Sequence, residues 1–126
     1  MTIKLNHMIV FARDKKASSK FLTELFGLPA ARPFGPFLAV QVGDVTLDFD
    51  EVDEVTPSHY AFLVSESEFD TIFARIRERN VAYWADPFKG LPGAINNHDG
   101  GHGVYFDDPD GHKLEIITRP YGSGAS

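Results

Sequence analysis

The chain contains no cysteine, one tryptophan and no apolar run of membrane-spanning length. Without cysteine it has no disulfide, no thiolate metal ligand and no thiol nucleophile. Basic residues are also scarce, since 12 Lys and Arg stand against 18 Asp and Glu, for a net charge of −6. This balance argues against nucleic acid, because phosphate binding needs clustered Lys and Arg. With no signal-type apolar segment in the first ten residues, we expect a cytoplasmic protein without membrane contact.

The remaining composition is sufficient for a packed core. The 126 residues are 43% hydrophobic and 13% aromatic, and 24% are charged. These values are typical of one globular domain rather than of a disordered chain. We therefore expect a single domain over residues 1–126.

The order of predicted elements repeats once along the chain. The first module, about 3–52, has a strand, a helix between Asp14 and Gly27, and three more strands; the strands cover 3–12, 30–34, 37–42 and 45–51. The second module, about 57–120, has strands over 59–64, 81–85, 103–107 and 112–118, with a helix after the first. We expect an α+β fold in which two β-α-β-β-β modules form one open, curved sheet of eight strands. The helices would cover its outer face and leave a concave inner face for a small ligand.

Four equivalent strand positions carry side chains that bind divalent metals. Alignment of the first strands places His7 on His59, and alignment of the last strands places Asp48 on Glu115. Alternation along the strands turns all four toward the inner face, because their apolar neighbours pack against the helices. The pattern therefore predicts a metal site on the concave face.

The segments around these positions read LNH (5–7), SHYAF (58–62) and YFDDPDGHKLE (105–115). In them, and over about residues 5–120, the chain resembles the vicinal oxygen chelate superfamily. The resemblance implies that His7, His59 and Glu115 bind one divalent ion, and that the protein is an open-sided barrel of paired modules, commonly a homodimer. Asp48 is then either a fourth ligand or base, as in glyoxalase-like members, or it stops short of the metal.

Three further residues are candidates for the substrate pocket. The run from NNH (96–98) through Tyr105 to Glu115 is similar to the signature of extradiol ring-cleaving dioxygenases. In that family the residues matching His98 and Tyr105 line the metal pocket and assist substrate binding and proton movement. The alternative is that His98 lies on a mobile loop and Tyr105 only packs there. Trp84 either lines the pocket or belongs to the core.

Two histidines and one carboxylate leave metal positions open, as in non-haem Fe(II) oxygenases. We therefore expect an enzyme that acts on a chelating, oxygenated small molecule. A dioxygenase-like reaction is favoured, with Fe²⁺ preferred over Mn²⁺, Zn²⁺ or Ni²⁺.

Three alternatives stay open. A glyoxalase-type lyase or isomerase requires Asp48 as ligand or base. A fosfomycin-type thiol transferase is weakened by Ile9, where those enzymes usually have threonine. A non-catalytic binder of bleomycin-resistance type suits the net charge of −6, but it has no need of the His, His, Glu set.

Overall fold

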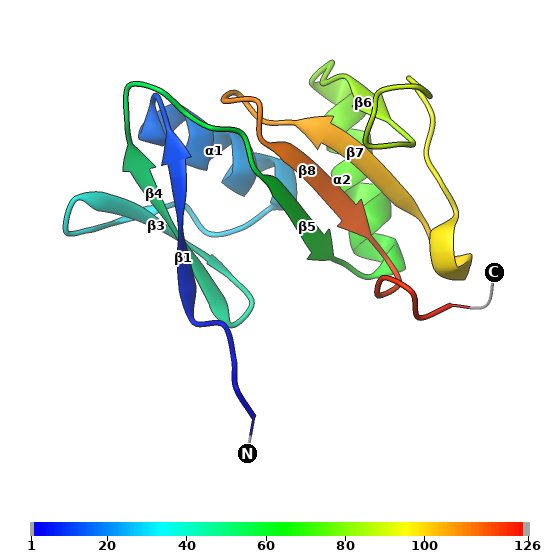
Figure 1. Ribbon diagram of the computed structural model, residues 1–126, viewed down its shortest axis with the longest axis horizontal. Coiled ribbons are helices and arrows are strands. Elements are labelled where there is room, and N and C mark those ends of the chain that lie inside the picture. The colour runs from blue at the N-terminus through cyan, green and yellow to red at the C-terminus, as the bar shows by residue number, and fades with distance from the viewer. Residues whose placement is uncertain (1, 125–126) are drawn as a thin grey trace. The chain divides into compact units, whose positions relative to one another are not determined.

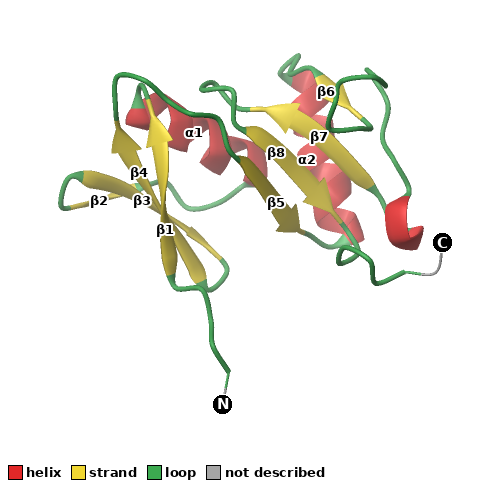
Figure 2. Ribbon diagram, in the orientation of Figure 1, coloured by secondary structure: helices red, strands yellow, loops and turns green. Residues whose placement is uncertain are grey.

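The computed structural model describes residues 2–124 (Figure 1). The chain forms two compact units, and the boundary between them falls between Thr56 and Pro57. Each unit contains one four-stranded sheet and one long helix (Figure 2), and backbone hydrogen bonds define the two sheets separately. The predicted α+β fold with two β-α-β-β-β modules is confirmed. No helix of the described residues is long and apolar enough to cross a membrane.

The first unit has its strands in the order β1-β4-β3-β2, with β1 parallel to β4 and the other pairs antiparallel. Its elements are β1 (His7–Ala12), α1 (Lys15–Phe26), β2 (Arg32–Phe34), β3 (Phe37–Val42) and β4 (Val45–Glu51).

Helix α1 begins and ends at the residues that the sequence predicts. The Asp14 carboxylate accepts a hydrogen bond from the Ala17 N–H at 3.0 Å, which satisfies a donor that has no partner within the helix. Gly27 ends the helix in the left-handed conformation, with φ of 69°. The helix lies against one face of the sheet and buries Leu22 and Leu25 there. The opposite sheet face, which carries His7, is left uncovered by α1.

The second unit repeats this arrangement, with the order β5-β8-β7-β6 and β5 parallel to β8. Its elements are β5 (His59–Leu63), α2 (Glu66–Glu78), β6 (Tyr83–Trp84), the short 3-10 helix η1 (His98–Gly100), β7 (Gly103–Asp107) and β8 (Lys113–Ile117).

Helix α2 is fixed at its start by the predicted capping box. The Ser65 hydroxyl accepts from the Glu68 N–H, and the Glu68 carboxylate accepts from the Ser65 N–H. The helix packs behind β8 and β7 in Figure 1 through a buried apolar stripe of Phe69, Ile72 and Ile76. Because α2 occupies that face, the alternate residues of β5, β7 and β8 face the other way.

The first strand is shorter than the sequence predicts. It begins at His7 rather than Ile3, because its partner β4 begins only at Val45, after the Gly43-Asp44 turn. The bond from the Thr46 N–H to the Asn6 carbonyl is the first of this pairing. Residues 2–5 have no opposite strand, and Ile3 is 98% exposed. Strands β2 and β6 are likewise shorter than predicted, by two and three residues respectively.

Candidate metal centre

His59 and Glu115 come together on neighbouring strands of the second sheet. His59 lies opposite Lys113, and Ala61 lies opposite Glu115. Since residues two apart on a strand share a face, the His59 and Glu115 side chains point the same way. The His59 Nε2 atom lies 3.0 Å from the Glu115 Oε1 atom.

One oxygen of the buried Glu115 carboxylate lacks a hydrogen-bond partner among the described residues. The residue is 3% exposed, and its Oε2 atom has no hydrogen-bond partner in residues 2–124. A buried carboxylate oxygen without a partner is destabilising by about 1–3 kcal/mol or more. A cation at this position would supply the partner, and imidazole with carboxylate is a donor set that divalent metals accept. These two side chains therefore fit the metal ion that the resemblance implies.

Tyr105 is the third side chain of this cluster. It lies directly opposite Glu115 in the β7–β8 pairing and is buried. Its ring packs edge-on against the His59 imidazole, with centroids 5.9 Å apart. Burial, together with a hydrogen bond to Glu115, raises the pKa of the Tyr105 hydroxyl. Tyr105 thus stays protonated well above neutral pH and can act as a hydrogen-bond donor.

His7 and Asp48 have the same arrangement in the first sheet. His7 lies opposite Thr46 and Ile9 lies opposite Asp48, so the His7 and Asp48 side chains share a face. His7 is exposed, and its Nδ1 atom lies 2.7 Å from the Asn6 side-chain oxygen. Asp48 is 5% exposed, and its Oδ1 atom has no partner in the described chain.

The candidate residues thus fall into two groups by unit. His59, Glu115 and Tyr105 are clustered in the second unit, whereas His7 and Asp48 belong to the first. Across residues 2–124, no three His, Asp or Glu side chains form a group that could hold a metal ion by itself. The complete set of His7, His59 and Glu115 stays a prediction.

The other two pocket candidates differ in their surroundings. Trp84 lies opposite Tyr105 in the β6–β7 pairing, and its ring contacts the Lys89 ammonium group at 4.7 Å. His98 begins η1 and is exposed. No contact of its ring with the His59–Glu115 pair is present in the described residues.

The two remaining histidines have structural partners. His112 is buried, and its Nδ1 atom accepts a hydrogen bond from the Ser58 N–H at 2.9 Å, which fixes the start of β5 next to His59. His102 pairs with Glu66 through an Nδ1–Oε1 distance of 2.6 Å. These contacts give neither His112 nor His102 a role as a metal ligand.

A cavity of about 410 Å³ opens beside His59 in the second unit. Alternation along β8 predicts Lys113 on this face, but the sequence gives no sign that Lys89 belongs here, since that residue lies in the long loop between β6 and β7. The lining residues are Pro57, Ser58, His59, Lys89, Asp107, Gly111 and Lys113.

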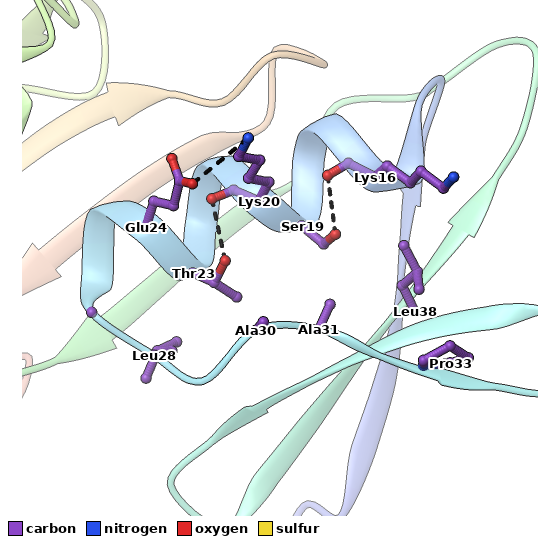
Figure 3. A pocket seen from close by; sticks show the side chains of 11 residues that line it. Lys16, Ser19, Lys20, Thr23, Glu24, Leu28, Ala30, Ala31, Pro33 and Leu38 are labelled. Atoms are coloured by element: carbon purple, nitrogen blue, oxygen red, sulfur yellow. Dashed lines mark hydrogen bonds and ion pairs between the residues drawn. The ribbon is translucent and has the colours of Figure 1, made fainter.

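A larger cavity, of about 670 Å³, lies in the first unit between α1 and the chain that leads into β2 (Figure 3). Its two buried hydroxyls already donate to helix carbonyls, Ser19 to Lys16 and Thr23 to Lys20. None of the candidate ligands lines it. The smaller cavity, which His59 lines, is therefore the candidate site.

Comparison with known proteins places these features in a family. The model of the Glyoxalase/Bleomycin resistance protein/Dioxygenase superfamily matches residues 4–116. The chain is 32% identical to the glutathione transferase FosA of Serratia marcescens, over 92% of this chain and 81% of that protein.

Among solved structures it is similar to the oxidase ChaP-H1, at 59% identity and a TM-score of 0.93, over 96% of this chain and 99% of that one. The oxidase ChaP-H2 gives 57% identity and a TM-score of 0.94, over 99% and 100% of the two chains. The expected superfamily is confirmed: this chain belongs to the Glyoxalase/Bleomycin resistance protein/Dioxygenase superfamily.

Proposed function

We propose that this protein is a metal-dependent enzyme that oxidises an oxygenated small molecule. One divalent ion, with Fe²⁺ preferred, is held by His7, His59 and Glu115. The observation that carries the proposal is the buried Glu115 carboxylate, which has one oxygen beside the His59 Nε2 atom and the other without a partner in the described chain. The 59% identity to an oxidase over nearly the full length supports oxidation as the reaction class.

A divalent ion bound there would polarise the oxygens of a chelating substrate and, as Fe²⁺, would allow oxidation by O₂. Tyr105 donates its hydroxyl hydrogen to an oxygen of the substrate on which negative charge develops. The raised pKa of Tyr105 suits this role, since the group remains a donor at neutral pH. Asp48 accepts the proton that a substrate hydroxyl loses on binding. His98, on the loop before β7, contributes to proton movement at the bound substrate.

Thiol transfer is the second candidate reaction. It is favoured by the 32% identity to the Serratia transferase and by 25% identity to the metallothiol transferase FosB of Lysinibacillus sphaericus, over 94% of this chain and 84% of that protein. A glyoxalase-type lyase has no comparable support. A binder without a metal leaves the buried Glu115 oxygen unexplained.

The test begins with elemental analysis of protein purified without added metal. The Fe²⁺-loaded protein is then assayed for oxygen uptake with a panel of catechols, and separately for conjugation of glutathione to fosfomycin. Glu115→Gln should abolish metal binding and activity, while Glu54→Gln, an exposed loop residue, serves as the matched control. Conjugation without oxygen uptake would replace the oxidase proposal by the transferase one. Absence of bound metal in the wild type would overturn both.

A further inference from the structure

Three residues that lie opposite one another on neighbouring strands line the cavity beside His59. His59 lies opposite Lys113, and Lys113 lies opposite Asp107. Glu115 and Tyr105 form the next cross-strand pair on the same face, because Glu115 is two residues from Lys113 and Tyr105 is two residues from Asp107. Lys113 is thus an immediate neighbour of a candidate metal ligand, on an adjacent strand about 4.8 Å away.

The loop after β6 brings a second ammonium group to this cavity. The Asp86 carboxylate folds the loop by accepting hydrogen bonds from the N–H groups of Phe88, Gly90 and Leu91. Lys89, at the centre of this turn, has a positive φ of 61° and donates to the Asp107 Oδ2 atom at 2.7 Å. These contacts hold the half-exposed Lys89 side chain at the cavity wall.

The cavity lining carries more positive than negative charge. Lys89 and Lys113 provide two ammonium groups, whereas Asp107 provides one carboxylate, and that carboxylate is already bonded to Lys89. Lys113 donates to the Pro87 carbonyl, which is an uncharged acceptor. In a chain of net charge −6, this local excess of positive charge is a specific feature of the cavity. It favours an anionic ligand group and disfavours a cationic drug.

We propose that Lys113, supported by Lys89, binds an anionic oxygen group of the substrate beside its metal-chelating oxygens. The inference rests on the metal-dependent function proposed above and narrows its substrate class to oxygenated molecules that also carry a carboxylate. An ammonium–carboxylate hydrogen bond is stronger than a neutral one and directs the orientation of the ligand. The substrate is thereby held at two points, the metal and Lys113, which fixes the end that is presented to Tyr105.

The same lysines also connect the loop to β7 and β8, through Asp107 and the Pro87 carbonyl. A role confined to holding the loop would change the affinity for charged and neutral ligands equally. An anion anchor changes only the affinity for charged ones. The ratio of the two affinities therefore separates the roles.

The experiment compares 3,4-dihydroxybenzoate with 3,4-dihydroxybenzamide, which share the chelating catechol and differ in charge. Binding to the Zn²⁺-loaded protein, in which O₂ oxidation does not proceed, is measured by calorimetry. The wild type should bind the benzoate about tenfold more tightly than the benzamide, as expected for a charge-assisted contact at a partly exposed site. Lys113→Met should abolish this preference and Lys89→Met should reduce it. Lys113→Arg should retain it, as should Lys20→Met, which removes an exposed lysine of α1.

Metal content and benzamide binding separate a failure of the anion anchor from a failure of the metal-dependent function. If metal and both catechols bind but the wild type shows no preference, or Lys113→Met keeps it, the anion anchor is overturned and the metal-dependent function stands. An equal loss of affinity for both catechols in Lys113→Met would also overturn the anchor, in favour of a loop-holding role. A wild type that binds no metal would overturn the proposed function and this inference with it.

Discussion

Asp48 has the same register position in the first sheet that Glu115 has in the second. Each is the cross-strand partner of the residue two positions after a histidine, Ile9 for Asp48 and Ala61 for Glu115. Both carboxylates are buried, and each has one oxygen without a partner in the described residues. Glu115 lies within hydrogen-bonding distance of a histidine, with its Oε1 atom 3.0 Å from the His59 Nε2 atom. The repeat therefore provides two similar carboxylates whose roles need separate tests.

We expect Asp48→Asn to retain bound metal and to lower turnover by about 100-fold, the size of a typical general-base contribution. Asparagine keeps the shape of the side chain but cannot accept a proton at neutral pH. Metal content and oxygen uptake are measured on the same preparation, with Asp50→Asn, on the same strand, as the control. Loss of metal instead would make Asp48 a fourth ligand. Full activity would leave it without a catalytic role.

Replacement of any one of the three candidate ligands should weaken metal binding by more than about 100-fold, beyond the usual effect of changing a ligand's neighbour. The variants are His7→Ala, His59→Ala and Glu115→Gln, titrated with metal under anaerobic conditions. His102→Gln is the control, since that imidazole pairs with Glu66 rather than with a candidate ligand. Undiminished affinity in His7→Ala would remove the first unit from the metal site.

The protein should be a homodimer at micromolar concentration. Strands β1 and β5 each have a single neighbour within their sheets, and Ile9, Phe11 and Leu63 on them are exposed. A twofold dimer is the simplest way to cover such apolar edge strands. Sedimentation equilibrium measures the state, and a monomer would contradict the prediction.

Co-refolding of His7→Ala with Glu115→Gln then shows how the metal ligands are divided between chains. Recovery of about a quarter of the metal sites, the fraction expected from random pairing of a twofold dimer, would place His7 and Glu115 of one site on different chains. No recovery would place them on the same chain.

Tyr105→Phe should lower turnover and leave metal content unchanged, because phenylalanine retains the buried ring and loses the donor. Burial raises the pKa of Tyr105 above its ordinary value of 10. The stabilisation of the folded state by protonated Tyr105 is therefore present below pH 10 and is lost as the pH rises further. In an alkaline titration followed at 295 nm, the Tyr105→Phe variant should therefore lack the absorbance change of the tyrosine that ionises at the highest pH. Identical titration curves would contradict the expected environment.

His98→Gln tests whether the loop histidine takes part in proton movement. We expect lower turnover with unchanged metal content. Unchanged turnover would show that His98 is an exposed loop residue without a role in the chemistry.

Asp14→Ala should lower the free energy of unfolding by about 1 kcal/mol, the usual effect of losing a helix N-cap. Asp14 accepts from the Ala17 N–H at the start of α1. Urea unfolding of this variant is compared with that of Asp53→Ala, which removes an exposed loop carboxylate. Equal stabilities would show that α1 is held by its packing on the sheet alone.

The sequence by itself determined the features that depend on near neighbours. The caps at Asp14 and at Ser65 and Glu68, and the end of α1 at Gly27, follow from local hydrogen bonding and backbone conformation. That the His59 and Glu115 side chains lie on the same face of the sheet follows from the two-residue period of a strand. The repeat of the two modules likewise rests on the order of short local patterns.

Only the tertiary structure decided features that depend on residues distant in sequence. Strand β1 begins at His7 because its parallel partner β4 begins only at Val45, whereas the pattern of residues 3–6 by itself continues the strand. Lys89 reaches Asp107 because the loop folds around Asp86, which no periodicity predicts. The unmatched oxygen of Glu115 is also a tertiary property, since whether a buried polar atom is satisfied depends on every group that the folded chain brings near it.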